Sequence, residues 1–150
     1  AIASKTRSSD WNAALLALDA TIHTTKASHM AEDYFSRGGL TEGELITKIC
    51  FEIPSKGIYL KQTRASSTDA VIGVLVSRFE KKCRVAIVGA QRAAFLCPAL
   101  ETALSKKFHQ DVYDHSHIPD GMLSDNADAS LDYQQNLVAI LCKKAIGSCA

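Results

Sequence analysis

The chain has 150 residues, 47% of them hydrophobic, which is enough for one domain with a hydrophobic core and a short additional element. Its 17 basic and 16 acidic side chains leave a net charge of +1, which excludes the strongly basic surface of a nucleic-acid or acidic-membrane binder. No apolar run is long enough to span a bilayer and no signal peptide is visible, so we expect a soluble, cytoplasmic protein.

The first third of the chain predicts a short helix, a strand and a helical turn. Ser9 or Asp10 can cap the helix. Its apolar face would consist of Trp11, Ala14, Leu15 and Leu18. Residues 20–25 alternate β-branched residues with others and favour a strand, and residues 30–36 favour a helical turn that ends at Gly38-Gly39.

Strand-like segments dominate the middle of the chain. They cover residues 45–53, 58–64, 70–79 and 84–88. Short connections, among them the turn signal Pro54-Ser55-Lys56-Gly57, join one strand to the next. Such an order is typical of an antiparallel meander.

The last third predicts two helices separated by a long polar loop. Pro98 suits the first position of a helix, and residues 109–126 are polar and favour a loop. Asp128 or Ser130 can cap the closing helix. Its apolar positions would include Tyr133, Leu137, Ile140, Leu141 and Cys142. Strands followed by helices indicate the α+β class, with an antiparallel sheet packed on helices.

The five cysteines form no recognisable framework. Their number is odd, their spacing is irregular and no CxxC pair occurs, so neither a disulfide scaffold nor a zinc or iron–sulfur motif is indicated. We expect buried thiols in a reducing compartment, with Cys149 at the end of the chain as the exposed one.

Several segments resemble, in the correct order, the FAD-binding medium subunit of the aerobic carbon monoxide dehydrogenase and xanthine dehydrogenase family. Residues 2–18 are similar to its IAxxDPxxDxPAALLAL segment, and Glu44-Leu45-Ile46-Thr47 to its GE(I/L)(I/L)T. Residues 58–64 resemble its YxKxxxR strand, residues 83–90 its RVAxxGA strand, and residues 124–137 the start of its last helix. The resemblance covers nearly the whole chain as a C-terminal fragment of that subunit.

The resemblance implies a fold, a cofactor and partners. Residues 1–42 would be the remnant of an FAD-binding domain, and residues 43–150 would form the C-terminal domain of the flavoprotein. The subunit would relay electrons from iron–sulfur clusters through FAD to an external acceptor. Its partners would be an iron–sulfur small subunit and a molybdopterin large subunit, which carries out substrate oxidation.

The same resemblance implies five cofactor-binding positions and no catalytic or metal-binding residue in this chain. Ala3 would contact FAD through its backbone, and Ser4 and Asp10 would hydrogen-bond the cofactor. Ile46 would pack against the isoalloxazine ring, and Lys61 would face it. Four of the five have a structural alternative from their residue type: helix capping for Ser4 and Asp10, core packing for Ile46 and a solvated strand lysine for Lys61.

The sequence departs from the family at the phosphate-binding turns. Thr6-Arg7 stands where the family has Asp-Pro. In the family, glycines precede this segment, and in this sequence only Ala1 stands there. Glycine turns hold the pyrophosphate because only glycine lets the backbone approach it closely. We therefore expect these 150 residues alone to bind FAD poorly or not at all.

Two other functions stay open from the sequence. The chain can be a remnant or interaction module without cofactor and without catalytic activity, whose uncovered apolar surface drives self-association into a homo-oligomer. The segment His109 to His117 is rich in His and Asp and could hold a metal, although it matches no recognised ligand spacing.

Overall fold

The computed structural model describes residues 2, 9–63, 69–90, 93–123 and 129–150. Its helices are α1 (Asp10–Ala17), α2 (Ala31–Ser36), α3 (Pro98–Lys106) and α4 (Leu131–Cys149), with 3-10 turns η1 (Gln110–Val112) and η2 (His115–His117). Its strands are β1 (Thr21–Thr24), β2 (Ser28–Met30), β3 (Ile46–Cys50), β4 (Lys56–Thr63), β5 (Ala70–Arg78), β6 (Cys83–Val88) and β7 (Phe95–Leu96).

The larger sheet has the strand order β4-β5-β6-β7, with antiparallel neighbours throughout. Strand β5 is an almost unbroken aliphatic run because helices cover both faces of the sheet at this central strand. Three of the four predicted strands, those that begin near residues 58, 70 and 84, form the meander of this sheet. That part of the prediction is confirmed.

The smaller sheet has the antiparallel order β2-β1-β3. Ile22 at its centre lies opposite His29 on one side and Ile49 on the other, and it is fully buried. The segment predicted as a strand at residues 45–53 forms β3 and pairs here with β1, so its expected place in the meander is wrong. Hydrogen bonds of this sheet therefore join residues on both sides of position 42, where the sequence suggested a domain boundary.

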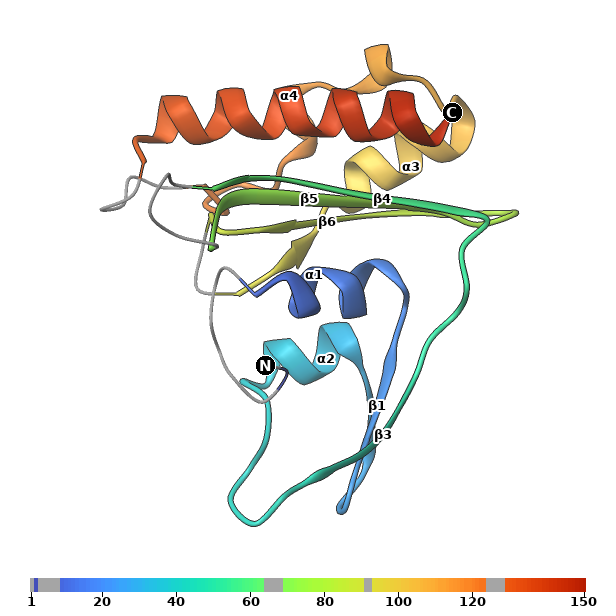
Figure 1. Ribbon diagram of the computed structural model, residues 1–150, viewed down its shortest axis with the longest axis vertical. Coiled ribbons are helices and arrows are strands. Elements are labelled where there is room, and N and C mark those ends of the chain that lie inside the picture. The colour runs from blue at the N-terminus through green and yellow to red at the C-terminus, as the bar shows by residue number, and fades with distance from the viewer. Residues whose placement is uncertain (1, 3–8, 64–68, 91–92, 124–128) are drawn as a thin grey trace.

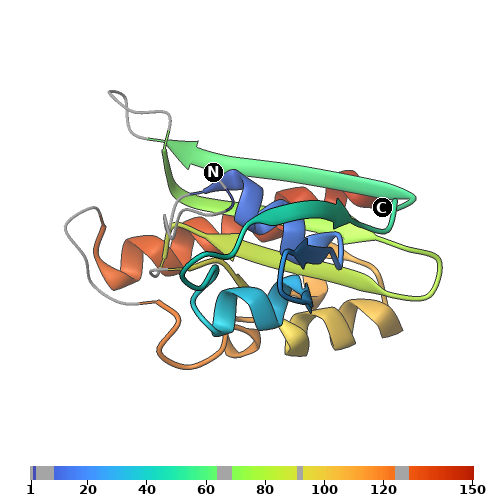
Figure 2. The ribbon, with the colours of Figure 1, turned by 90° about the horizontal axis from the view of Figure 1, so that it is seen from below.

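The elements stack in layers around the larger sheet. Helix α4 packs on β4 and β5, and α3 packs on β6; α1 packs against β5, β6 and β7 from the other face (Figure 1). Helix α2 and the smaller sheet follow beyond α1. Seen from that side, the smaller sheet and α2 lie in front of the larger sheet (Figure 2). The α+β class is confirmed, with two antiparallel sheets where one was expected.

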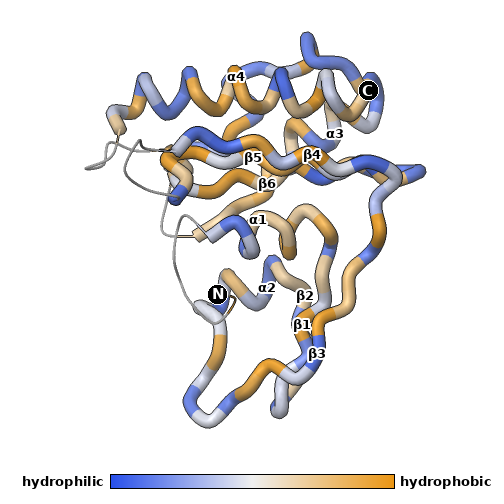
Figure 3. The backbone as a smooth tube through the Cα atoms, viewed as in Figure 1, coloured by the Kyte–Doolittle hydropathy of each residue, from blue (hydrophilic) through white to orange (hydrophobic). Residues whose placement is uncertain are grey.

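Two hydrophobic clusters lie on opposite faces of the larger sheet. Figure 3 shows hydrophobic segments in this sheet and in the elements on both sides of it. The α4-side cluster joins aliphatic residues of β5 and β6 to α3 and α4; among its members are Ile72, Val74, Ile87, Leu100, Leu104 and Ile146. The α1-side cluster joins the same sheet to α1, α2 and β1. Its members include Ala13, Leu16, Ala17, Ile22, Tyr34, Ala86 and Leu96.

The buried face of α1 differs from the predicted one. Trp11 is 60% exposed, whereas Asn12 and Ala13 are buried. The helix lies between the larger sheet and α2, so it buries more than the single stripe that an amphipathic surface helix buries. Leu15 is buried as predicted, whereas a sequence pattern that assumes one apolar face places Trp11 wrongly.

Both ends of the predicted closing helix can be compared with α4. Ser130 is its N-cap, since its Oγ accepts a hydrogen bond from Tyr133 N at 3.4 Å, as expected. The expected exposure of Cys149 is wrong: α4 continues to this residue, which is fully buried, and its Sγ donates to Val76 O at 3.6 Å. Within the described part of the chain, no helix is long and apolar enough to cross a membrane.

Candidate functional site

Two of the five predicted cofactor-binding residues meet in the structure. Asp10 at the start of α1 and Lys61 in β4, 51 residues apart in sequence, form an ion pair with Lys61 Nζ 2.7 Å from Asp10 Oδ2. Ile46 lies elsewhere, in the smaller sheet. Ala3 and Ser4 lie outside the described residues, so their predicted contacts stay predictions.

The carboxylate of Asp10 points to the larger sheet and does not cap its own helix. Ser9 occupies the N-cap of α1 without a side-chain hydrogen bond to the backbone. Asp10 follows it in the first turn, where a negative charge also interacts favourably with the positive end of the helix dipole. Its Oδ1 accepts a hydrogen bond of 2.5 Å from the hydroxyl of Tyr59, and its Oδ2 accepts from Lys61.

Strand geometry explains why Tyr59 and Lys61 reach the same carboxylate. Side chains two residues apart in a strand point to the same face of the sheet. Tyr59 packs against the α1-side cluster, whereas Ile58 and Leu60 pack against the α4-side cluster. Lys61 shares the face of Tyr59, and α1 places Asp10 over that face. Sequence reasoning missed Tyr59, although its spacing of two from Lys61 was the available signal.

The three side chains differ in their exposure to solvent. The side chain of Asp10 is 43% exposed and that of Lys61 is 30% exposed, so both can meet a ligand. Tyr59 is half-buried. Burial and the neighbouring carboxylate of Asp10 raise the pKa of the Tyr59 hydroxyl, so it stays a hydrogen-bond donor at physiological pH. The arrangement therefore presents a carboxylate held by two donors and paired with the ammonium group of a part-exposed lysine.

Ile46 occupies a position that also has a structural role. It pairs with Thr24 of β1, is half-buried and packs against the α1-side cluster. Core packing is the ordinary role of a strand isoleucine. The predicted contact of Ile46 with an isoalloxazine ring stays a prediction.

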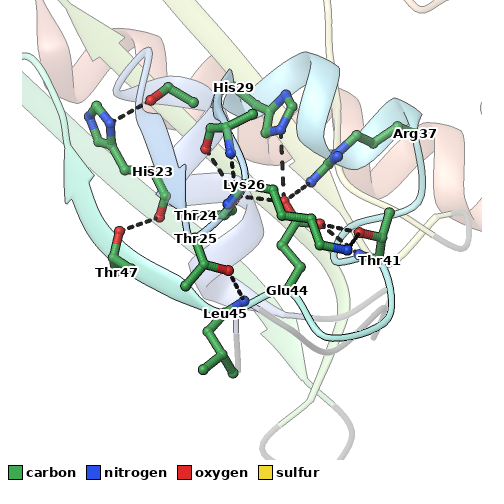
Figure 4. A network of polar contacts seen from close by, with 12 residues as sticks. His23, Thr24, Thr25, Lys26, His29, Arg37, Thr41, Glu44, Leu45 and Thr47 are labelled. Atoms are coloured by element: carbon green, nitrogen blue, oxygen red, sulfur yellow. Dashed lines mark hydrogen bonds and ion pairs between the residues drawn. The ribbon is translucent and has the colours of Figure 1, made fainter.

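A polar network centred on Glu44 lies immediately before β3 (Figure 4). The buried Glu44 carboxylate accepts hydrogen bonds from Thr24 Oγ1 at 2.6 Å, Arg37 Nη2 at 2.9 Å, and both N and Oγ1 of Thr41 at 2.8 Å. These contacts join β1, the end of α2 and the loop that leads into β3. His29 of β2 approaches the same carboxylate with its Nε2 at 4.0 Å.

The environment of Glu44 favours its ionised form. The hydrogen bonds from Thr24, Thr41 and Arg37 hold the pKa of the Glu44 carboxyl well below its usual value. Sequence reasoning used Glu44 only as part of a family motif and gave it no role. The structure shows that it connects β1 to the end of α2 and to the loop that leads into β3.

A third charged cluster lies at the other end of α1. Asp19 follows that helix, and its carboxylate lies 2.5 Å from Lys82 Nζ and 2.7 Å from Arg84 Nε. Arg84 also pairs with Glu101 of α3 at 3.0 Å, and Lys82 pairs with Glu52 at 2.8 Å. The hydrogen bond to Asp19 is the largest of the effects that raise the pKa of Lys82. Charged contacts therefore fix both ends of α1 to the larger sheet.

The histidine-rich loop uses its side chains for local structure. His109 Nδ1 accepts from Asp111 N at the start of η1, and His117 Nδ1 accepts from Asp114 N at η2. Among the described residues, no group of three or more His, Cys, Asp or Glu side chains is placed to hold a metal ion. The loop geometry itself accounts for the polar residues of this segment.

No protein-family model matches the chain, and the search of curated proteins found no match. The fold does match solved structures. Over 99% of its length the chain superposes on a chain of quinoline 2-oxidoreductase from Pseudomonas putida 86, with a TM-score of 0.78 and 17% identity. Two carbon monoxide dehydrogenases are similar to it as well.

The first of these is the carbon monoxide dehydrogenase from Hydrogenophaga pseudoflava that lacks the Mo-pyranopterin moiety of the molybdenum cofactor, with a TM-score of 0.75, 19% identity and 99% coverage of this chain. The second is reconstituted CO dehydrogenase from Oligotropha carboxidovorans, with a TM-score of 0.78, 15% identity and 98% coverage. The chain spans 58% of the length of each of these three matched chains. These matches confirm the expected resemblance at the level of the fold.

Proposed function

We propose that the chain is part of the FAD-containing electron-transfer subunit of a molybdenum hydroxylase related to carbon monoxide dehydrogenase and xanthine dehydrogenase. The main support is the ion pair between Asp10 and Lys61, which lie 51 positions apart in sequence. The family resemblance assigns both residues to contact with the flavin. The shared fold with chains of carbon monoxide dehydrogenase and quinoline oxidoreductase supports the same proposal.

The donors and acceptors at this place suit one polar side of a flavin nucleotide. A part-exposed carboxylate can accept hydrogen bonds from ribityl hydroxyls, and a part-exposed ammonium group can donate to a ring oxygen. FAD, when bound, supplies transfer of one or two electrons. Lys61 would place a positive charge beside the ring, where it favours negative charge on the reduced cofactor, and Asp10 would orient that charge. Ala3, Ser4 and Ile46 complete the proposed contacts.

The chain would comprise parts of two domains and would work together with two partner subunits. Residues 1–42 would belong to the FAD-binding domain and residues 43–150 to the C-terminal domain, in a cytoplasmic assembly. An iron–sulfur small subunit would deliver electrons, and a molybdopterin large subunit would oxidise the substrate. This chain would then pass the electrons through FAD to an external acceptor.

Titration of the purified chain with FAD, followed by quenching of flavin fluorescence, tests this function. We expect weak, saturable binding that is weaker still in Lys61→Met and Asp10→Asn, because both variants remove a charged contact to the cofactor. The exposed Lys48→Met serves as the matched control and should bind like the wild type. Binding that is identical in wild type and Lys61→Met would contradict the proposal.

An interaction module without cofactor is the second candidate, because large apolar side chains are exposed around β3. Leu45 precedes this strand and Phe51 and Ile53 follow it, all with more than half of their surface accessible. Exposed apolar groups of this size favour association. Light scattering at increasing concentration distinguishes the two candidates: a strict monomer at high concentration would count against the interaction module.

A further inference from the structure

Tyr59 contacts Asp10 independently of Lys61. Its hydroxyl donates to Oδ1 of the carboxylate, whereas Lys61 donates to Oδ2. Two donors on two different oxygens fix the plane of a carboxylate as well as its position. Lysine has a long flexible stem, so a carboxylate that is itself held restricts the ammonium group more than a carboxylate that rotates.

We propose that Tyr59 is a positioning residue: through Asp10 it fixes the ammonium group of Lys61 where a bound flavin meets it, and Gly73 provides the space that the Tyr59 hydroxyl needs. This inference rests on the proposed function for the identity of the ligand. Asp10 and Lys61 would contact the cofactor themselves, whereas Tyr59 would act on the cofactor only through them.

Gly73 is required for space at the centre of β5, where it pairs with Lys61 of β4. A Cβ atom on Gly73 would lie 2.4 Å from the Tyr59 hydroxyl oxygen, 3.0 Å from Tyr59 Cζ and 2.8 Å from Val88 Cγ2. Contacts this short force a neighbour to move, and the hydroxyl is the group in closest conflict. Any larger residue at position 73 therefore displaces the hydroxyl that holds Asp10.

Gly57 provides a matched control for Gly73. It also lies within the larger sheet, in β4, but among the described residues a Cβ atom there would meet only Pro54 Cγ at 3.7 Å and Ser77 Oγ at 3.8 Å. Both are ordinary van der Waals distances. Gly57→Ala should therefore leave Tyr59 in place, whereas Gly73→Ala should not.

The mobility of the Lys61 ammonium group, measured by ¹⁵N relaxation, tests the positioning role in the protein without cofactor. In the wild type we expect Lys61 to be ordered relative to the exposed Lys48. Tyr59→Phe, which keeps the ring and removes the hydroxyl, should lose this order, and so should Gly73→Ala. Gly57→Ala should retain it. If Gly73→Ala does not fold, Tyr59→Phe alone decides the result.

FAD affinity of the same variants provides the second measurement. We expect Tyr59→Phe to weaken FAD binding on the order of tenfold, the effect of losing one charge-assisted hydrogen bond. An ordered Lys61 in Tyr59→Phe, or unchanged FAD affinity where the wild type binds, would overturn the positioning role. Equal FAD binding by the wild type and Lys61→Met would instead count against the proposed function. If the wild type binds no FAD, the relaxation comparison alone decides whether Tyr59 positions Lys61.

Discussion

The two faces of the larger sheet are held to their helices in different ways. The α4-side cluster consists mainly of large side chains such as Ile72, Leu104 and Ile146, and the free energy of their burial scales with apolar area. More than half of the α1-side cluster is alanine, which buries little area but lets α1 lie close to the sheet. Charged contacts from Asp10 and Asp19 tie the two ends of α1 to the sheet.

This difference indicates which half of the molecule can carry a binding site. The α4 side gains its stability from close packing, so the side chains of its cluster are buried in the core. The α1 side depends more on polar contacts, and its carboxylates and ammonium groups lie partly in solvent. Asp10 and Lys61, which hold the start of the helix in place, are also the groups that the proposed site would use.

Removal of a large side chain from the α4 side should have the largest effect. We expect Ile146→Ala to lower the free energy of unfolding by about 2–5 kcal/mol, because it leaves a cavity in a fully buried place. Ile140→Ala on the exposed side of the same helix is the control and should stay within about 0.5 kcal/mol of the wild type. Urea unfolding followed by circular dichroism measures both. Equal losses would show that α4 is not packed as described.

Glu44 provides a pH-dependent test of the half that contains the smaller sheet. Its pKa is lowered in the folded chain from the ordinary 4.5, so the ionised group stabilises the fold above about pH 4.5 and this contribution is lost as the pH falls. We expect Glu44→Gln to be less stable than the wild type at pH 7, with a difference that narrows below pH 4.5. The exposed Glu32→Gln should show no such difference. A gap that is constant from pH 7 to pH 3 would contradict this role.

Asp19→Asn tests the ion pairs of Asp19 with Lys82 and Arg84 at the C-terminal end of α1. Asp19 has a backbone φ of 48°, a conformation that Asn also adopts readily, so the substitution changes the charge with little backbone effect. We expect a loss of about 1–2 kcal/mol, since Lys82 and Arg84 both lose their charged partner. Glu52→Gln, at an exposed pair with Lys82, should cost less than about 0.5 kcal/mol. Equal unfolding midpoints in urea for Asp19→Asn and the wild type would argue against a stabilising role of these ion pairs.

The ion pair of Asp10 and Lys61 should contribute least to stability. Both side chains are partly in solvent, and such pairs contribute about 0–1 kcal/mol. We expect Lys61→Met to change the free energy of unfolding by less than about 1 kcal/mol, and the change to fade in 1 M salt, where charges are screened. A large effect that does not respond to salt would mean that Lys61 belongs to the core. A small effect on stability together with weaker FAD binding would show that Lys61 serves cofactor binding and contributes little to the stability of the fold.

Local signals in the sequence predicted much of the fold. The β-branched runs indicated the strands of the larger sheet, Pro98 occupies the first turn of α3, and Ser130 caps α4. These features depend on neighbouring residues and on backbone chemistry, so the sequence reveals them without any knowledge of tertiary contacts.

Predictions that depended on distant partners were wrong or incomplete. A single apolar stripe places Trp11 on a buried face, whereas α1 is covered on more than one side and leaves Trp11 exposed. Cys149 was expected to be exposed because it lies near the end of the chain, and α4 carries it into the core. The strand at Ile46 has the same local character as the meander strands, and only its partner, β1, distinguishes it from them.

The sequence by itself determined the α+β class and most of the elements, because periodicity and capping are local properties of the chain. The cofactor-binding role of Asp10 and Lys61 stays a prediction from the family resemblance. Only the tertiary structure decided that these two residues meet, that Tyr59 holds the carboxylate between them and that Gly73 leaves room for it. Such contacts join residues far apart in sequence, and their geometry depends on how a helix packs over a sheet.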